Sequence, residues 1–302
     1  MRYGVPYKGS KNSIAEWVYS HFPKADNFYD LFAGGCAITQ IALMRQEYKN
    51  YFCNDIDGDG IKLFLGAIYG NYKNETRWID RQTFFAEKEK DPFIKYCWSF
   101  GNNGRNYLYG EDLEPLKKAW HYAIFYNDLS LAKKIGLDLT SITHLTDIRD
   151  RYLETKHITE SVIHNEDITR YQTLGRLQQL EALNRLQSLQ SLQSLQSDFA
   201  SVKILPHSII YCDIPYHETD AYEEGKGNNF DYERFYSWCE QQTEPVFISE
   251  YWMPEDRFEC IDSIEKCVTL QSGAGNKAIE KLFIPKHQHY DKWQGTLFEG
   301  LL

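Results

Sequence analysis

The tetrapeptide DIPY, residues 213–216, ends an apolar stretch, and its residue types suit chemistry on an amino group. A buried strand has no structural need to finish on an acid followed so soon by an aromatic side chain. The carboxylate of Asp213 and the backbone carbonyl of Ile214 can both accept hydrogen bonds from one exocyclic amino group, while Tyr216 can stack on the planar base that carries it. The tetrapeptide therefore predicts a site that holds an amino-bearing base.

A second motif, DLFAGGCA, places two glycines where a predicted strand passes into a predicted helix, at residues 30–37. Glycine lets the backbone approach a ligand closely, and a helix N-terminus favours polar or anionic groups. The pattern is neither the dinucleotide G-x-G-x-x-G nor a Walker loop, and a purely steric turn is an equal alternative.

An acid at the end of the following predicted strand favours the ligand interpretation. Asp55 lies about twenty residues beyond the glycine turn, where a carboxylate can accept both ribose hydroxyls of an adenosine-containing ligand. Asp57 is the nearby alternative, and both acids could instead cap the next helix. Taken together, the turn and the acid predict a nucleoside cofactor.

The elements that must position these residues alternate between strand and helix periodicity. This alternation predicts a parallel, doubly wound sheet, in which ligands bind outside the carboxyl ends of the strands. The predicted strands cover residues 27–35, 50–57, 207–216 and 244–251, with a terminal pair at 267–273 and 277–284; the predicted helices cover residues 14–22, 36–47, 59–70 and 232–242.

The alternation is lost in the middle of the chain, where aromatic-rich helical segments surround the polar stretch SFGNNGRNYLYG, residues 99–110. We therefore expect a Rossmann-like α/β catalytic domain formed by residues 1–70 and 198–302, interrupted by a largely helical insertion at residues 71–197. Leucine recurs at every third position from Leu174 to Leu195. In an α-helix this stripe drifts by about 60° per leucine, so a bent or interrupted, partly buried helix is expected.

Composition narrows the class of protein. The net charge of -10 requires any contact with nucleic acid to come from a local patch. Seven cysteines without a C-x-x-C pair predict a reduced, cytoplasmic protein, and no histidine spacing predicts a metal site. No apolar run has the length of a signal peptide or a membrane span. We expect a protein of a bacterial or phage-infected cell that is a monomer, with a dimer as the alternative, and that makes no membrane contact.

In this order, the segments YKGSK, DLFAGG, NDID and YCDIPY resemble the Dam-type family of DNA adenine methyltransferases, which use S-adenosylmethionine. The resemblance implies a Rossmann-like methyltransferase sheet, target recognition within the insertion, and double-stranded DNA as the partner. It places the amino-group clamp at Asp213, Ile214, Pro215 and Tyr216. It places cofactor contacts at Tyr7, Lys11, Phe32, Ala33, Gly34, Gly35, Asp55 and Asp213, and it makes Asn102, Asn103 and Arg105 candidates for DNA contact.

Three residues depart from the family pattern. Ile214 stands where the family has a second proline, Cys36 where it has a third glycine, and Tyr7 where it has a tryptophan. Isoleucine supplies the same backbone carbonyl, tyrosine keeps a stacking face, and cysteine fits the turn provided that its backbone angle is not one reserved for glycine. Activity is therefore expected to survive.

The expected reaction is direct transfer of the methyl group to the exocyclic amino group of a flipped adenine, without a cysteine nucleophile. Two alternatives remain at this stage. One is a methyltransferase acting on another amino group, in RNA, cytosine or protein. The other is a noncatalytic nucleic-acid-binding module, against which Asp213 and Lys11 argue.

Overall fold

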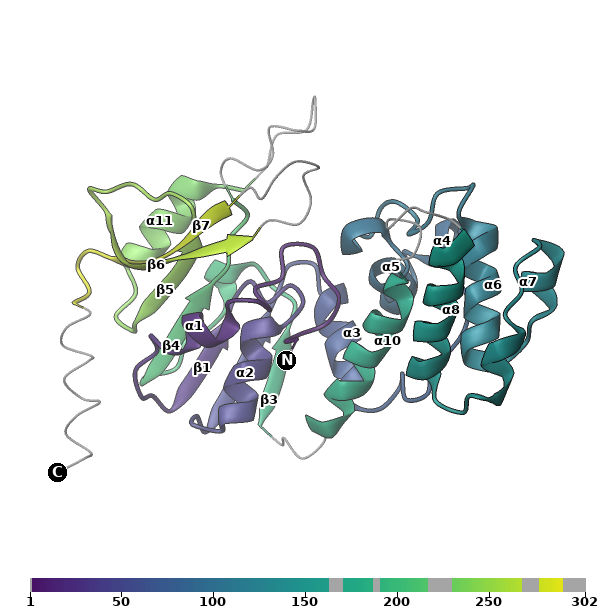
Figure 1. The fold of residues 1–302 in the computed structure, drawn as a ribbon. Helices are drawn as coiled ribbons and strands as arrows, with labels where there is room; N and C mark the ends of the chain where they lie inside the picture. Colours follow the sequence, from purple (N-terminus) through teal and green to yellow (C-terminus); the bar gives the residue numbers. More distant parts are fainter. Residues whose placement is uncertain (1, 163–170, 187–190, 217–229, 268–276, 290–302) are drawn as a thin grey trace. The chain divides into compact units, whose positions relative to one another are not determined.

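The computed structural model describes residues 2–162, 171–186, 191–216, 230–267 and 277–289 (Figure 1). The chain divides into two compact units. The sheet unit comprises Met1–Tyr69 and Leu183–Leu302, and the helical unit comprises Gly70–Ala182. The second boundary thus lies at Leu183, fifteen residues before the predicted 198, because the segment that follows Leu183 enters the sheet.

The described strands of the sheet unit form one seven-stranded sheet in the order β3-β2-β1-β4-β5-β7-β6. The first five strands in this order are parallel, and β7 and β6 complete the sheet in antiparallel pairing. The strands are β1 (Asn27–Asp30), β2 (Asn50–Asn54), β3 (Leu192–Leu195), β4 (Ser208–Cys212), β5 (Val246–Glu250), β6 (Phe258–Cys267) and β7 (Lys277–Pro285). The predicted doubly wound α/β fold is confirmed. Of the predicted terminal pair, most of residues 267–273 lies outside the described residues, and β6 precedes it.

Helices cover both faces of the sheet, as the continuous burial of its central strands requires. They are α1 (Ala15–Tyr19), α2 (Ala37–Arg45), α3 (Asp59–Ile68) and α11 (Tyr232–Glu240), and the short 3₁₀ turns η3 (Asn184–Leu186) and η4 (Phe199–Ser201) precede and follow β3. On the α11 face, Phe235 packs with Ile210 and Ile248 in one buried cluster. On the opposite face, Phe22, which follows α1, contacts the rings of Phe28 and Tyr211.

The leucine triplets form both a helix and a strand. In α10 (Gln172–Leu183), leucines 174, 177, 180 and 183 are all buried. Further along, Leu192 and Leu195 belong to β3, which pairs with β2. Residues three apart in a strand point to opposite faces, so the two half-buried leucines lie on opposite faces of this edge strand, and Gln193 and Ser194 between them are exposed. The predicted interruption of the helix is therefore a change to β structure.

Removing residues 189–191 should leave the stability of the protein nearly unchanged. Residues 186–197 are four copies of LQS, so deleting any one copy gives the same sequence and leaves an intact LQSLQS before Asp198. The contacts of β3, and the hydrogen bond from Ser197 N to Asn54 Oδ1 (3.0 Å), are then preserved. Thermal unfolding should shift by a few degrees at most. The control deletes residues 196 and 197, which breaks the repeat phase; equal losses in both variants would contradict this interpretation.

The helical unit is built around buried aromatic side chains. Its elements are α4 (Arg81–Glu87), α5 (Pro92–Cys97), η1 (Phe100–Asn102), α6 (Glu114–Tyr126), α7 (Ser130–Lys134), η2 (Thr140–His144), α8 (Ile148–Val162) and most of α10. His121 is fully buried, and its ring nitrogens contact Tyr171 Oη (2.5 Å) and Thr76 O (2.6 Å). Burial lowers the pKa of His121 to about 4, so this histidine is a neutral structural group at physiological pH. None of the described helices is long and apolar enough to cross a membrane.

Candidate active site

Three sequence motifs meet because their strands are neighbours. β1 lies between β2 and β4, and all three run parallel, so their carboxyl ends share one edge of the sheet. The glycine turn follows β1, Asp55 follows β2, and Asp213 follows β4. The chain also changes direction across the sheet between β1 and β4, which is where doubly wound sheets bind ligands.

The glycine turn packs tightly against the N-terminal segment. Val5 N donates to Gly35 O at 2.8 Å. A Cβ atom at Gly34 would lie 2.9 Å from Cε1 of Tyr7, and one at Gly35 would lie 2.6 Å from Cβ of Tyr7. Any residue other than glycine at these positions would displace Tyr7. The predicted residues Tyr7, Gly34 and Gly35 are therefore in direct contact with one another. Ala33 is buried beside them.

The backbone of Cys36 departs from the sequence-based expectation, and Phe32 has aromatic neighbours. Cys36 has φ 59° and ψ 33°, which is the left-handed conformation that favours glycine, so the condition for a comfortable cysteine fit is not met. A non-glycine residue there costs about 1 kcal/mol. The side chain of Phe32 packs into the aromatic cluster with Phe199 (5.5 Å between ring centroids) and Phe235 (5.8 Å).

The two acids after β2 have separate partners. Asp55 Oδ2 accepts from Gly34 N (2.8 Å), which joins the end of β2 to the glycine turn. Asp57 is exposed, and its Oδ1 accepts from the backbone N of Asp59, the first residue of α3 (3.2 Å). The capping interpretation therefore fits Asp57, whereas Asp55 faces the turn. Burial raises the pKa of Asp55, and its hydrogen bonds from Gly34 and Asp57 oppose this shift.

At the end of β4, Asp213 forms an ion pair with a lysine from the N-terminal segment. Lys11 Nζ lies 2.5 Å from Asp213 Oδ1, and the lysine is buried while Asp213 keeps 21% of its side-chain surface exposed. The family resemblance places Lys11 beside the cofactor; the structure adds this direct pairing with the clamp acid. Burial alone would lower the pKa of Lys11, but the charges of Asp213 and Glu280 outweigh it and raise the pKa.

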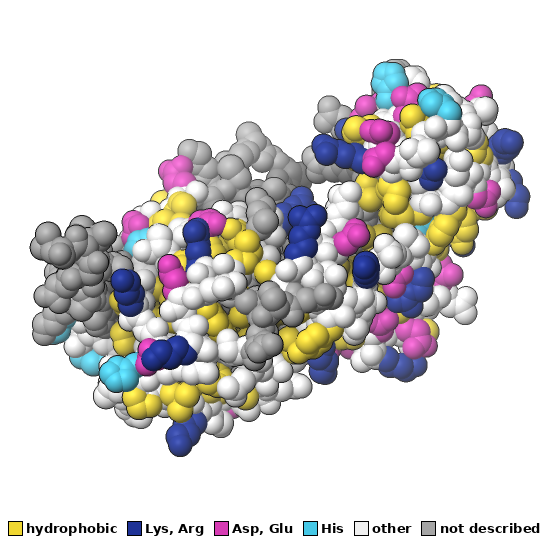
Figure 2. All heavy atoms as spheres, turned by 90° about the horizontal axis from the view of Figure 1, so that it is seen from below, with side chains coloured by type: hydrophobic (Ala, Val, Ile, Leu, Met, Phe, Trp, Pro, Cys, Tyr) yellow, Lys and Arg dark blue, Asp and Glu magenta, His cyan; other side chains and the backbone are white. Residues whose placement is uncertain are grey.

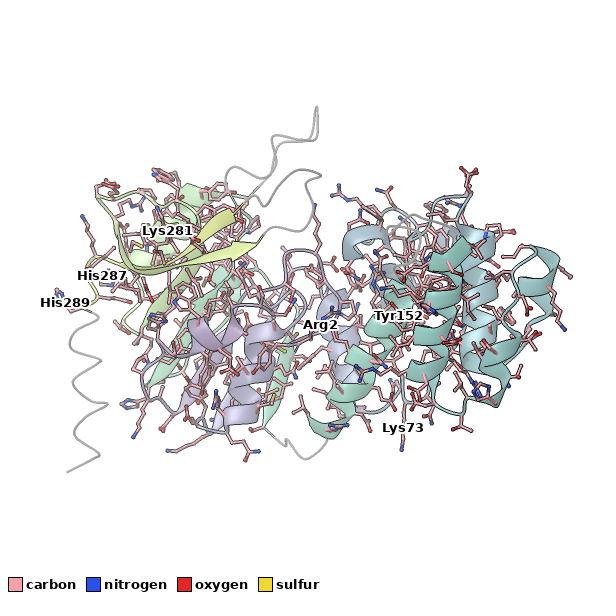
Figure 3. All side chains as sticks on the ribbon, in the orientation of Figure 1. Arg2, Lys73, Tyr152, Lys281, His287 and His289 are labelled. Carbon is pink, nitrogen blue, oxygen red and sulfur yellow. The ribbon has the colours of Figure 1, made fainter. Side chains whose placement is uncertain are left out.

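Glu280 of β7 is a site residue that sequence reasoning missed. Its side chain is fully buried, 3.6 Å from Lys11 Nζ. Tyr216 donates its hydroxyl to Glu280 Oε1 at 2.5 Å, and Lys11 Nζ lies 4.7 Å from the centre of the Tyr216 ring. The ring of Tyr251, which follows β5, lies 4.4 Å from that of Tyr216. The neighbouring Lys281 is labelled in Figure 3.

Asp30, the last residue of β1, is a buried acid with hydrogen bonds to one oxygen. Oδ2 accepts from Thr39 N (3.2 Å) and Thr39 Oγ1 (2.7 Å), and Oδ1 has no partner among the described residues. Burial raises the pKa of Asp30 to about 7; the bonds from Thr39 oppose the rise, and the charges of Asp213 and Asp55 add to it. The acids of this site thus outnumber Lys11, and the site favours a cationic ligand.

The Asp30→Asn variant should lose part of the pH dependence of stability. The folded-state pKa lies above the ordinary value of 3.8, so the contribution of Asp30 is complete below about pH 4 and is lost as pH rises through 7. Asparagine keeps the acceptor for Thr39 and cannot ionise. Urea unfolding at pH 4 and pH 8 measures the free energy of unfolding of both proteins. The difference between variant and wild type should shift in favour of the variant by up to about 4 kcal/mol between pH 4 and pH 8. Parallel stability profiles of the two proteins would contradict a buried, titrating Asp30.

In the helical unit, the polar stretch after α5 forms a tight loop. Asn103 Oδ1 accepts from the backbone N of Arg105 (2.8 Å), and Asn102 Nδ2 donates to Tyr96 O (2.9 Å). Buried Arg176 supports the loop by donating to the carbonyls of Cys97 (2.7 Å) and Ser99 (2.9 Å). The two asparagines therefore shape the loop, and Arg105 is the exposed member of the predicted set. On the face shown in Figure 2, basic side chains are interspersed with acids.

A sequence model of the D12 class N6 adenine-specific DNA methyltransferases matches residues 7–109. This part of the chain is similar to that family, and the match spans about a third of the sequence. The match covers the glycine turn, Asp55 and the loop that carries Arg105, and it ends before Asp213. No curated protein matches the chain. The match supports the predicted adenine-specific DNA methyltransferase, a class that in general uses S-adenosylmethionine and acts on DNA.

The structure also shows how Ile214 and Cys212, on either side of Asp213, are packed. The Ile214 side chain lies in the buried cluster beside α11, so an apolar residue suits the position and its backbone carbonyl is retained. Cys212, next to Asp213, is fully buried, and burial raises the pKa of its thiol well above the usual value. Such a thiol is a poor nucleophile. Among the described residues, no three histidines, cysteines or acids gather as a metal site.

Proposed function

We propose that the protein transfers the methyl group of S-adenosylmethionine to the exocyclic N6 amino group of an adenine flipped out of double-stranded DNA. The observation that carries the proposal is the convergence of the glycine turn, Asp55 and Asp213 at the ends of three adjacent parallel strands. The family supplies adenine as the base.

The residues of the site fit S-adenosylmethionine. Asp55 has a carboxylate at the turn that can accept ribose hydroxyls, and the glycines at 34 and 35 leave the backbone open to a close ligand. The partly exposed Asp213 and the buried Glu280 share one ammonium group, that of Lys11, which leaves one net negative charge to face a sulfonium cation. Bound S-adenosylmethionine supplies an electrophilic methyl group.

The clamp residues act on the adenine amino group. The Asp213 carboxylate and the Ile214 carbonyl accept its two N–H hydrogens, which localises the lone pair on N6. Tyr216 stacks on the base and partly replaces the stacking lost on flipping. Once N6 carries the methyl group, its extra proton leaves toward the Asp213 carboxylate, which Lys11 holds in place. No covalent enzyme intermediate is needed, in agreement with the buried Cys212 thiol.

The direct test uses purified protein, radiolabelled S-adenosylmethionine and random-sequence duplex DNA. Digestion of the product to nucleosides should place the label in N6-methyladenine. Label in a methylated cytosine, or in added RNA or protein in place of DNA, would overturn the proposal and favour another amino-group substrate.

The Asp55→Ala variant should bind S-adenosylmethionine more weakly. One charge-assisted hydrogen bond contributes about 1.5–3 kcal/mol, so loss of the ribose contact should raise the dissociation constant by at least about 10- to 100-fold. Isothermal titration calorimetry measures the change. Asp57→Ala is the matched control, since Asp57 is exposed two residues away and bonds the start of α3. A larger loss in the control would move the ribose contact to Asp57.

A further inference from the structure

Glu280 is a fully buried acid in β7, next to the apolar end of that strand. The β7 residues that follow Lys281, namely Leu282, Phe283 and Ile284, are buried hydrophobic side chains. Glu280 itself has 0% exposed side chain. A buried carboxylate carries a desolvation cost of several kcal/mol, and replacement of buried ion pairs by apolar residues is often neutral or stabilising. Stability alone therefore gives a poor reason for an acid at this position.

The contacts of Glu280 lead to the clamp. Oε1 accepts the hydroxyl of Tyr216 at 2.5 Å and lies 3.6 Å from Lys11 Nζ. Lys11 in turn pairs with Asp213, and its ammonium lies over the Tyr216 ring. One carboxylate oxygen thus holds both the aromatic ring and the lysine that flank Asp213. Burial, followed by the charges of Asp213 and Glu280, raises the pKa of Tyr216, so the phenol keeps the proton that it donates.

We propose that Glu280 is a positioning residue for methyl transfer, which fixes the ring plane of Tyr216 through the hydroxyl and thereby sets the stacking surface for the target base. The proposal rests on the proposed function, because it assigns the stacking role to Tyr216. The ring has a second contact in Tyr251, at an interplanar angle of 45°, which packs against it but does not tether the hydroxyl. Without Glu280, Tyr216 keeps its side chain but loses its fixed orientation.

The kinetic test compares Glu280→Ala, Glu280→Gln, Tyr216→Phe and the double variant Glu280→Ala with Tyr216→Phe. Loss of orientation should lower kcat by about 30-fold in Glu280→Ala and to a similar extent in Tyr216→Phe, with unchanged S-adenosylmethionine affinity. The double variant should be no slower than the slower single variant, because both changes remove one tether. Glu280→Gln retains an acceptor oxygen, so its kcat should stay within about 3-fold of the wild-type value. This variant keeps the test usable if Glu280→Ala does not fold.

Glu265→Ala is the matched control, because Glu265 is an exposed acid on the neighbouring strand β6. It should leave kcat unchanged. The positioning role would be overturned if folded Glu280→Ala had the wild-type kcat. It would also be overturned if the reduction in kcat of the double variant equalled the product of the two single reductions. A loss in Glu280→Gln as large as that in Glu280→Ala would overturn it too.

A measurement without DNA separates this inference from the proposed function. In protein with ¹³C-labelled tyrosine rings, the signal that disappears in Tyr216→Phe identifies Tyr216. That signal should shift in Glu280→Ala and stay in place in Glu265→Ala. If wild-type protein methylates no DNA while the signal shifts, the proposed function fails and the tether stands; if the signal does not move, the tether is refuted whatever the activity.

Discussion

The Asp213→Asn variant will methylate DNA about a thousandfold more slowly than the wild type, on the scale of lost acid-base and charge-stabilising groups. Asparagine keeps the shape of the side chain but removes the negative charge, and its amide hydrogens oppose those of the adenine amino group. Charge-assisted hydrogen bonds are roughly twice as strong as neutral ones, so the clamp is weakened where the amino nitrogen attacks. Single-turnover methyl transfer measures the loss directly.

Folding should survive this change. Asp213 is partly exposed, and Lys11 keeps Glu280 at 3.6 Å as a partner. Asp256→Asn serves as the control, because Asp256 is exposed in the loop before β6. If the folded Asp213→Asn protein transfers methyl groups at the wild-type rate, DIPY is not the catalytic motif.

The strand ends could be predicted from sequence because each carries a local signal. Short apolar runs that stop at Asp30, Asp55 and Asp213 give both the strand and the polar residue at its carboxyl end. In a parallel sheet these ends must share an edge, so the meeting of the motifs follows from topology alone. The alternation of helix and strand periodicity before and after the insertion is therefore sufficient to predict the α/β fold of the sheet unit.

Other features depend on contacts that periodicity does not encode. The LQS repeat has neither the period of a helix nor that of a half-buried strand, and β3 forms where β2 offers a parallel partner for its backbone. Glu280 lies far from DIPY in the chain, on a strand added in antiparallel orientation, so only the three-dimensional pairing reveals its contact with Tyr216. An inward-facing acid within KAIEKLFI was the available signal. The left-handed angle of Cys36 follows from the tight turn and leaves no trace in residue type.

Replacing Lys11 by methionine should have the largest combined effect on stability and activity. The change leaves Asp213 and Glu280 without the ammonium that both approach, and an uncompensated buried charge costs about 3–5 kcal/mol. Methyl transfer should fall below the detection limit, because Asp213 loses the partner that holds it. Lys8→Met is the matched control, since Lys8 is an exposed lysine three residues away on the same segment.

The pH dependence of this loss distinguishes charge from packing. The pKa of Lys11 is raised in the folded protein, so its contribution is present at neutral pH and would be lost only as pH rises through that raised value. In Lys11→Met the two carboxylates repel each other and resist ionisation, so the deficit in unfolding free energy should be large at pH 8 and should shrink toward pH 5, where protonation removes the charge. Adding Glu280→Gln removes one of the two charges and should recover part of the stability at pH 8, but not the activity. A deficit that is equal at both pH values and unaffected by Glu280→Gln would mean that Lys11 acts through the packing of its aliphatic chain, and the buried charge network would then have no role in stability.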